Sequence, residues 1–388
     1  MGDRLARGWL WFAALMAPPI LLLSFRSFPA ITSAYALPAL IGLAKAPSVK
    51  APPPWVITLG LLVVYSVLSV LWTPQGGAAD WIWWQPVLFL VGFGVFQGPR
   101  PPVHMLTIGL SIALGLLFID AITGSGIRAI VPPDNRPDKD AVATARGIGI
   151  LLMMMPFLVM AIGKSRGFLW AIGALIIYMI AAVAAPVEAN VVAAFTGLSA
   201  GLLAAWQPGL ALRSVLAGAG FALAAPFALA LSLPSVQVLA AMSSLPSSSI
   251  HRLIIWRTVL DEWLAGQTLF GAGARATRAL SKEAGRLELS GFGVEVSQVS
   301  VHPHNVPIEI LYEYGLVGYG LLVASFVLVA RALLRHALSR EACAAVTSLA
   351  AIIIVIFSVQ TTMWNVYFSS ATLLTAYALY GLFGEKAG

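Results

Sequence analysis

Residues 302–320 read HPHNVPIEILYEYGLVGYG, and they mark the point where a long polar segment leads into an apolar helix. Two of the five histidines of the chain lie here, separated by one proline. Pro303 fixes its own φ and favours an extended backbone at His302. Asn305 is a residue type that caps helices, so we expect His304 to lie just before a helix start.

The predicted helix after Asn305 carries polar side chains on one face. Glu309, Tyr312 and Glu313 recur at helical spacings of three and four. Gly315 and Gly318 would then allow close backbone approach within the bilayer. The stretch can be interpreted as a satisfied polar entrance to a helix or as a functional site, and the rest of the chain decides between the two.

The composition is that of a polytopic membrane protein. Of the 388 residues, 59% are hydrophobic and 10% are charged, and the mean hydropathy is +0.89. Such values exclude an ordinary soluble domain. The net charge of +7 is interpreted as a signal of membrane orientation and not of nucleic-acid binding. The one cysteine, Cys343, allows no intrachain disulfide.

Apolar runs predict an all-α fold with about twelve transmembrane helices. The first run, from Trp9 to Leu23, has no clear small-residue cleavage site after it, so we interpret it as a retained anchor. Residues 1–232 would hold nine spans with short loops, 233–304 one large outer loop with short helices, and 305–388 three more spans. The predicted spans are 9–23, 28–43, 55–72, 80–96, 104–120, 147–163, 168–185, 189–206, 211–232, 308–330, 342–358 and 366–384.

The charges of the connectors predict the orientation. With both termini cytoplasmic, the short inner connectors are basic, whereas Arg26 is the one basic residue of the short outer loops. Nearly all acidic residues then fall on the outer side, so polar chemistry is concentrated there. For a bacterial chain this outer side would be the periplasm. The predicted inner basic residues are Arg4, Arg7, Lys45, Lys50, Arg100, Lys164, Arg166, Arg213, Arg331, Arg335, Arg340 and Lys386.

The first long outer segment, 121–146, is a loop rich in Gly, Pro, Asp and Asn. Arg146 ends it, where an apolar span begins, and it is either a snorkelling anchor or part of a site. Asp138 and Asp140 form a D-x-D pattern that can hold a divalent ion against a diphosphate, but an acidic solvated loop explains it as well. His302 and His304 lack a third ligand for zinc. We therefore expect neither a metal nor another cofactor.

The large outer loop, 233–304, contains a predicted helix from Ser247 to Leu264 with a broad apolar face, lying on or near the membrane. Serine side chains at 247–249 would cap it. Arg252 would then fall in the first turn and Arg257 in the second. A cation in the first turn opposes the helix dipole, and its placement becomes favourable if an anion binds there. The charged residues of 274–301 are interpreted mainly as a solvated face.

The spacing His304-Asn305, nine residues, Gly315, two residues, Gly318 resembles the H-N-x9-G-x-x-G pattern of the O-antigen ligase and O-antigen polymerase family. The twelve predicted spans, the inner termini and the large loop after the ninth span agree with this resemblance. His251-Arg252 with Trp256 resembles the start of that family's loop, and Arg146-Gly147 before an apolar span resembles another segment of some members. One feature departs from the ligase branch: the short outer loop 186–190 has no arginine. Either Arg146 supplies that charge or the chain belongs to another branch.

The resemblance implies a C-type glycosyltransferase of the bacterial inner membrane that moves a glycan from undecaprenyl diphosphate to an acceptor hydroxyl at the periplasmic face. A diphosphate leaving group needs charge stabilisation, which Arg252, Arg146 and Arg257 would supply. His304 would act as base or orient the acceptor, because histidine titrates near neutral pH. The further candidate substrate-binding residues are His302, Asn305, Glu309 and Tyr312.

Three functions remain open at this point. A ligase would use lipid A core oligosaccharide as acceptor, and a polymerase would use another lipid-linked repeat; we lean towards the ligase. A transporter or flippase of lipid-linked sugars belongs to a different class. It would carry polar groups near the bilayer midplane and interrupted helices in matching halves, whereas the predicted spans have almost no charge in their middles.

Overall fold

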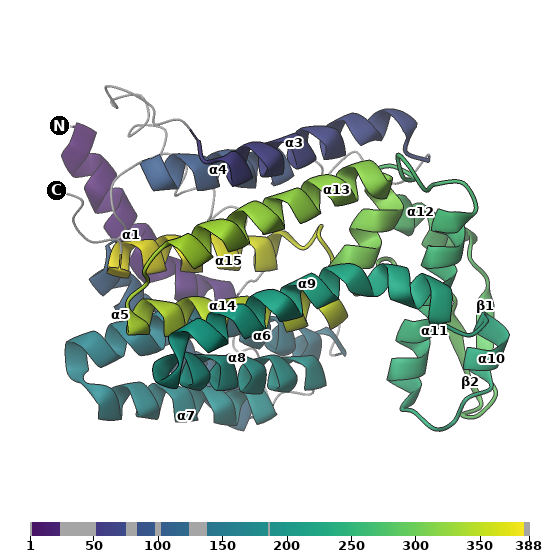
Figure 1. Ribbon diagram of the computed structural model, residues 1–388. Coiled ribbons are helices and arrows are strands. Elements are labelled where there is room, and N and C mark those ends of the chain that lie inside the picture. The colour runs from purple at the N-terminus through teal and green to yellow at the C-terminus, as the bar shows by residue number, and fades with distance from the viewer. Residues whose placement is uncertain are drawn as a thin grey trace.

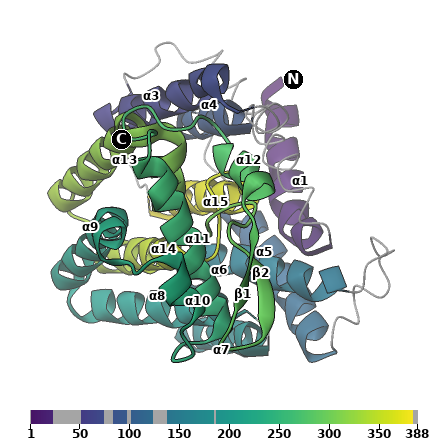
Figure 2. The same ribbon diagram turned by 90° about the vertical axis from the view of Figure 1, so that its right-hand side faces the viewer.

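The computed structural model of the protein describes residues 2–23, 52–74, 84–97, 102–123, 138–184 and 187–383. In these residues the chain is mostly helical, and its two strands form one small hairpin (Figures 1 and 2). The predicted all-α class is therefore confirmed.

Within the described residues, seven helices are long and apolar enough to cross a membrane. They are α3 with η2 (Pro54–Leu68 and Ser69–Trp72), α5 (Val103–Ile122), α6 (Asp138–Arg166), α8 (Glu188–Trp206), α9 (Pro208–Ser232), α13 (Val306–Arg335) and α14 (Arg340–Val359). Shorter apolar stretches occur in α1 (Gly2–Leu23), α4 (Trp84–Gln97), α7 (Phe168–Ala184) and α15 (Val366–Phe383). The predicted span 28–43 lies outside the described residues, so the count of twelve stays a prediction.

The centre of the bundle is α6. Ile148, Met153 and Phe157 on this helix are each 0% exposed, because α5, α7, α8, α14 and α15 all pack against it. A helix that is apolar on every side is expected at such a central position. The outer helices instead expose large apolar side chains, such as Phe221 and Leu231 of α9, as a surface that faces lipid requires.

The segment 233–304 folds into a small unit at one end of the bundle, on the right in Figure 1. It contains α10 (Val236–Ala240), α11 (Ser247–Leu264), α12 (Ala276–Glu283) and a hairpin of β1 (Arg286–Leu289) and β2 (Val294–Ser297). The strands are antiparallel, with Arg286 opposite Ser297 and Leu289 opposite Val294. This hairpin was not predicted, because its alternation of apolar and charged residues was interpreted as a solvated face.

The predicted helix 247–264 is confirmed as α11, but its predicted cap is wrong. Pro246 is the N-cap residue, and no side chain accepts a hydrogen bond at this end. The serines instead form the first helical turn, so Arg252 lies beyond that turn. The argument that Arg252 opposes the helix dipole in the first turn therefore does not hold. Any role of Arg252 must be argued from its position relative to the histidines.

The helix α13 is interrupted at Gly315, which has φ 61° and ψ −164°. The backbone N–H groups of Leu316 and Val317 would bond to Tyr312 and Glu313 in a regular helix. They donate instead to the carbonyls of Thr268 (2.9 Å) and Leu269 (3.1 Å). The freed carbonyls of Tyr312 and Glu313 accept from the N–H groups of Ala272 (2.9 Å) and Gly273 (2.8 Å).

The loop segment 268–273 thus replaces the hydrogen bonds that the break removes from α13, as irregular backbone in a membrane protein requires. The end of α3 and η2 hold the same loop from the other side: the Tyr65 hydroxyl donates to Phe270 O (2.9 Å) and Trp72 Nε1 donates to Gly271 O (3.2 Å). The expected close approach at Gly315 therefore occurs, but it is to a loop and not to another helix.

Candidate active site

The segment that carries the two histidines is fixed at both sides. Trp256 Nε1 on α11 donates a hydrogen bond to Pro303 O at 2.8 Å. Asn305 is the N-cap of α13, as predicted, because its Oδ1 accepts from the N–H of Ile308 at 2.9 Å. The amide of Asn305 also donates to Ser358 O at the end of α14 (3.0 Å). These contacts hold His304 at φ 56°, a left-handed conformation that is uncommon outside glycine.

The two imidazole rings lie against each other, with centroids 4.2 Å apart and planes at 65°. His304 Nδ1 is 3.2 Å from the carbonyl oxygen of Gln360. Because a carbonyl only accepts, this contact assigns the ring proton to Nδ1 and leaves the lone pair of Nε2 for another partner. His302 Nδ1 is buried and has no hydrogen-bond partner among the described residues.

Burial lowers the pKa of His304 below its usual 6.5, and electrostatic interaction with Arg252 and His251 lowers it further, while the contact with Gln360 O opposes them. Burial, His304 and Arg146 lower the pKa of His302 to about 3. Both rings are therefore neutral at neutral pH, which is the form that can accept a proton.

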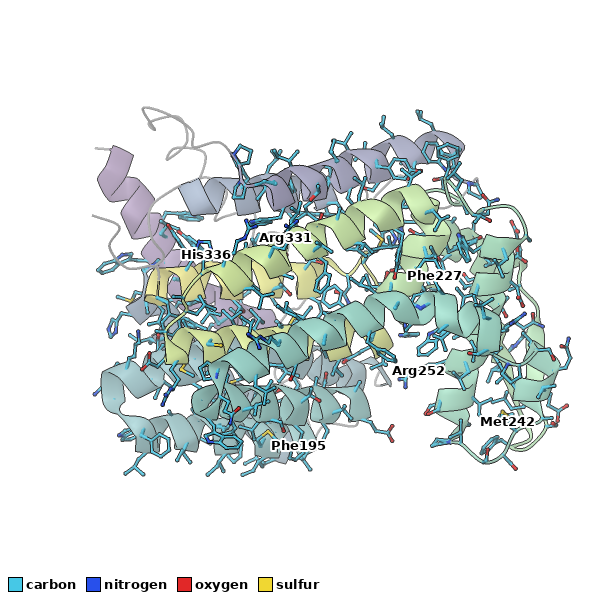
Figure 3. The ribbon with its side chains drawn as sticks, in the orientation of Figure 1. Phe195, Phe227, Met242, Arg252, Arg331 and His336 are labelled. Carbon is cyan, nitrogen blue, oxygen red and sulfur yellow. The ribbon has the colours of Figure 1, made fainter. Side chains whose placement is uncertain are left out.

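The same electrostatic contacts show which cations surround the histidines. Arg146, at the start of the apolar part of α6, acts on His302, and Arg252 on α11 acts on His304. Figure 3 labels Arg252 on the side of the unit 233–304 that lies next to the helix bundle. His251 Nε2 is 2.8 Å from Ser297 O, which ties α11 to strand β2. The charges of Arg146 on α6 and Arg252 on α11 thus both act on the histidine segment that precedes α13.

Arg257 lies in a different setting. Its guanidinium forms a bidentate pair with Asp261, with N–O distances of 2.9 Å and 2.7 Å, and it donates to Leu233 O (2.9 Å) at the end of α9. The described contacts of Arg257 therefore join α11 to α9, and none of them leads to the histidines.

Glu309 and Glu313 are both 0% exposed. Glu309 accepts from the Thr362 hydroxyl and from Met363 N (2.7 Å) in the turn between α14 and α15. Glu309 was predicted to bind substrate. In the structure its carboxylate joins α13 to this turn through these hydrogen bonds. Tyr312, the third predicted residue of this face, is 6% exposed and packs in the apolar cluster beneath α11.

Glu313 has a role that sequence reasoning missed. One of its carboxylate oxygens accepts from Arg275 N and Trp364 Nε1, both at 2.8 Å. The other accepts from the Thr277 hydroxyl at 3.0 Å and from Thr277 N at 3.3 Å. The carboxylate thus satisfies free N–H groups at the start of α12. The polar run 360–365 between two apolar helices was the available signal for such a partner.

No group of three or more His, Cys, Asp or Glu side chains that could hold a metal ion occurs among the described residues. The side chains of the predicted D-x-D pattern, Asp138 and Asp140, lie outside the described part. The histidine segment carries two neutral imidazole rings and lies within the influence of two guanidinium groups, and such groups can accept a proton and pair with an anion.

Comparison with known proteins adds no assignment. No family model matches the sequence, and no curated protein matches it significantly.

Proposed function

We propose that the protein is a membrane glycosyltransferase that moves a glycan from undecaprenyl diphosphate to an acceptor hydroxyl. In this proposal it is a protein of the bacterial inner membrane with twelve spans and both termini in the cytoplasm, and the histidine site faces the periplasm. The observation that supports the proposal is a pair of adjacent histidine rings that are neutral at neutral pH and lie within the electrostatic influence of two arginines, Arg252 for His304 and Arg146 for His302.

The reaction needs one proton acceptor and charge stabilisation. The bond between the anomeric carbon and the diphosphate oxygen breaks, and its electron pair leaves with the diphosphate. The acceptor oxygen forms the new bond to the anomeric carbon, and its proton passes to Nε2 of His304. Arg252 and Arg146 stabilise the charge on the diphosphate through paired N–H donors. No metal takes part in the proposed step.

Transfer to lipid A core oligosaccharide, the ligase reaction, is the version that we favour, and polymerisation with another lipid-linked repeat as acceptor is the alternative. The two reactions share the donor and the proposed chemistry. They differ only in the acceptor molecule whose hydroxyl is placed next to His304. A deletion strain separates them, because loss of capped chains with accumulation of lipid-linked polymer indicates a ligase, and a single-repeat cap indicates a polymerase.

The test of the proposed chemistry is transfer by purified protein in lipid, with the lipid-linked donor and acceptor supplied. Arg252→Lys keeps the charge and loses the paired donors, so we expect a large loss of rate. Arg278→Lys, at an exposed position on α12, is the matched control and should transfer at the wild-type rate. Normal transfer by Arg252→Ala in folded protein would exclude the assigned role.

A reporter fused near Gln298 should score as periplasmic, and a cytoplasmic score would overturn the topology.

One observation favours a second function, a transporter of lipid-linked sugars. The interruption of α13 at Gly315 and the buried carboxylates beside it resemble features of transporters, in which broken helices bind substrate. The oxygens of Glu309 and Glu313 are, however, bonded to protein donors. Movement of labelled donor across a vesicle membrane without acceptor, and no transfer with acceptor, would favour the transporter.

A further inference from the structure

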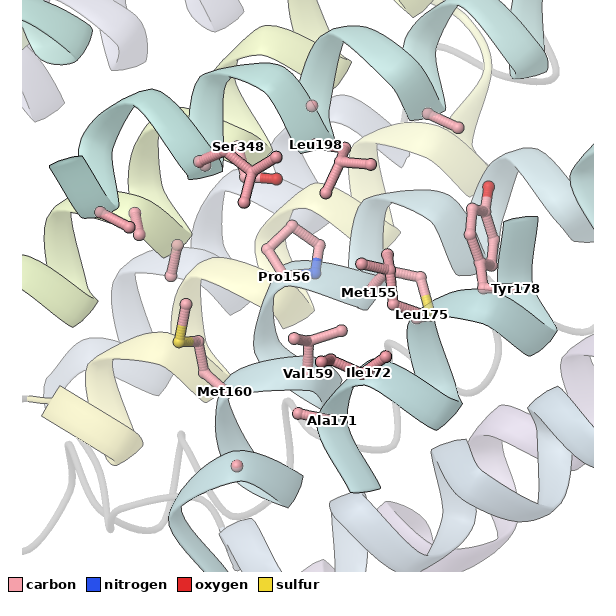
Figure 4. Close-up of a pocket in the computed structure, with 18 of the residues that line it drawn as sticks. Met155, Pro156, Val159, Met160, Ala171, Ile172, Leu175, Tyr178, Leu198 and Ser348 are labelled. Atoms are coloured by element: carbon pink, nitrogen blue, oxygen red, sulfur yellow. The ribbon is translucent and has the colours of Figure 1, made fainter. Parts of the chain in front are cut away.

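A cavity of about 580 Å³ lies among α6, α7, α8 and α14, and we call it the α7–α8 groove (Figure 4). Its volume is in the range of roughly 300–1,000 Å³ that is typical of ligand sites. The lining is almost wholly apolar and includes Met155, Pro156 and Val159 of α6, Leu175 of α7 and Leu198 of α8. An open apolar space of this size is expected to hold an apolar chain, because its walls otherwise lack packing partners.

Several residues of α8 and α14 that line the groove are small, and their short side chains leave room for it. Gly201 of α8 lines the groove, and a Cβ at this position would make an ordinary contact of 3.6 Å with Ser348 Cβ on α14. Tyr178 lines the groove and is 1% exposed, and its hydroxyl has no hydrogen-bond partner among the described residues. The groove is thus a built feature of the packing, with one unpaired polar group in its wall.

The length of the groove is that of one membrane leaflet. Its α6 wall runs from Leu152 to Lys164, about 18 Å at 1.5 Å per residue. That is slightly more than half of a hydrocarbon core of about 30 Å. Ile148, Ile150 and Leu151 on α6 are at most 2% exposed and do not line the groove, so buried helix separates it from Arg146. These dimensions suit the acyl chain of a phospholipid better than the longer polyprenyl chain of a donor held at Arg146.

The opening of the groove carries one cation and one anion. Lys164 and Glu341 are the charged residues of the lining, and both are exposed. Lys164 Nζ lies 3.5 Å from Leu382 O and 4.3 Å from the centre of the Phe383 ring, which places it at the end of α15, away from the histidines. A phosphate would pair with Lys164 and a primary ammonium with Glu341.

We propose that the α7–α8 groove binds one acyl chain of a phosphatidylethanolamine from the leaflet on the Lys164 side. Phosphatidylglycerol offers the phosphate without the ammonium. Phosphatidylcholine offers a methylated ammonium without N–H donors, so it cannot donate to Glu341. The site is separate from the histidines and does not depend on the function proposed for them.

The test is lipid retention by the purified full chain, measured by native mass spectrometry with phosphatidylethanolamine, phosphatidylglycerol or phosphatidylcholine of equal chain length. The wild type should retain one phosphatidylethanolamine, about two- to fivefold more strongly than either other lipid, because a charge pair at an exposed position contributes only modestly. Gly201→Leu fills the groove and should abolish retention. Gly173→Leu is the control, because Gly173 has open space and does not line the groove.

A second variant keeps the test decisive if Gly201→Leu does not fold. Glu341→Gln, at an exposed position, should remove the preference for phosphatidylethanolamine over phosphatidylglycerol, whereas Glu188→Gln, exposed on α8, should not. Equal retention of all three lipids by the wild type would overturn the proposal. So would undiminished retention by folded Gly201→Leu, or displacement of phosphatidylethanolamine by undecaprenyl phosphate.

Discussion

Gly271 and Gly315 face each other backbone to backbone, and neither position has room for a Cβ. A Cβ on Gly315 would lie 2.5 Å from Gly271 N, and a Cβ on Gly271 would lie 2.5 Å from Gly315 N. Both residues also have positive φ, 75° and 61°. The contact is the point at which the loop 268–273 enters the break in α13, so it fixes the position of everything that precedes the break, including the histidines.

Substitution at this contact should therefore disrupt the fold. We expect Gly315→Ala and Gly271→Ala each to lower the melting temperature of the purified protein, because the clash is with backbone that cannot rotate away and positive φ adds about 1–2 kcal/mol. Gly320→Ala, farther along α13 with open space at its Cβ position, should be neutral or slightly stabilising. Equal melting temperatures for Gly315→Ala and Gly320→Ala would contradict the described break.

Glu313 should act on stability and not on chemistry. Glu313→Gln leaves an amide NH₂ facing N–H donors, and a buried donor without an acceptor costs about 1–3 kcal/mol. We expect a lower melting temperature and, below it, near wild-type transfer per folded molecule. Glu283→Gln, at an exposed site on α12, is the control. A variant of Glu313 that melts normally but transfers no glycan would instead indicate direct contact with substrate.

The two histidines should differ in their effect on transfer. General-base removal typically costs a factor of about 10² to 10⁴ in rate, so His304→Ala should lose nearly all activity at an unchanged protein level. His302→Ala should be much milder, because its role is to lie against the ring of His304. His336, at the far end of α13, is the matched control (Figure 3). Activity in His304→Ala with none in His302→Ala would reverse the two roles.

The pH dependence of transfer should report the lowered pKa of His304. The base works when neutral, so the rate falls as the pH drops through this pKa, and the midpoint should lie below 6.5. Arg252→Gln removes a nearby positive charge and should move the midpoint upward, towards 6.5. A midpoint above 6.5 in the wild type, measured as kcat/KM so that it reports the substrate-free protein, would exclude His304 as the titrating base.

The stability of the folded protein should also decrease as the pH drops. The unfolded chain takes up protons on histidine below about 6.5. The folded pKa of His302 is about 3, so the unfolded state binds more protons between these values. The contribution of His302 to the melting temperature should thus be independent of pH above about 6.5. It should lower the melting temperature as the pH drops from there towards 3.

Local pattern was enough for several features of this protein. The apolar runs predicted the helices, the apolar face of 247–264 predicted α11, and Asn305 was recognised as the cap of α13. These features depend on residues within a few turns of one another, so periodicity and residue type report them. The same local rules failed for the serines at 247–249, because Pro246 is the N-cap residue and the serines are the first residues of α11.

The tertiary structure alone decided which residues meet. The packing of α6, α9 and α11 places the charge of Arg146 where it lowers the pKa of His302 and the charge of Arg252 where it lowers the pKa of His304, while Arg257 is held by Asp261 and α9. The exchange of backbone hydrogen bonds at Gly315 is of the same kind. Its donors and acceptors come from the loop 268–273, which lies about 40 to 50 residues away in sequence. The sequence marked Gly315 as a glycine in an apolar helix, but the partner that made the break stable had to be brought there by the fold.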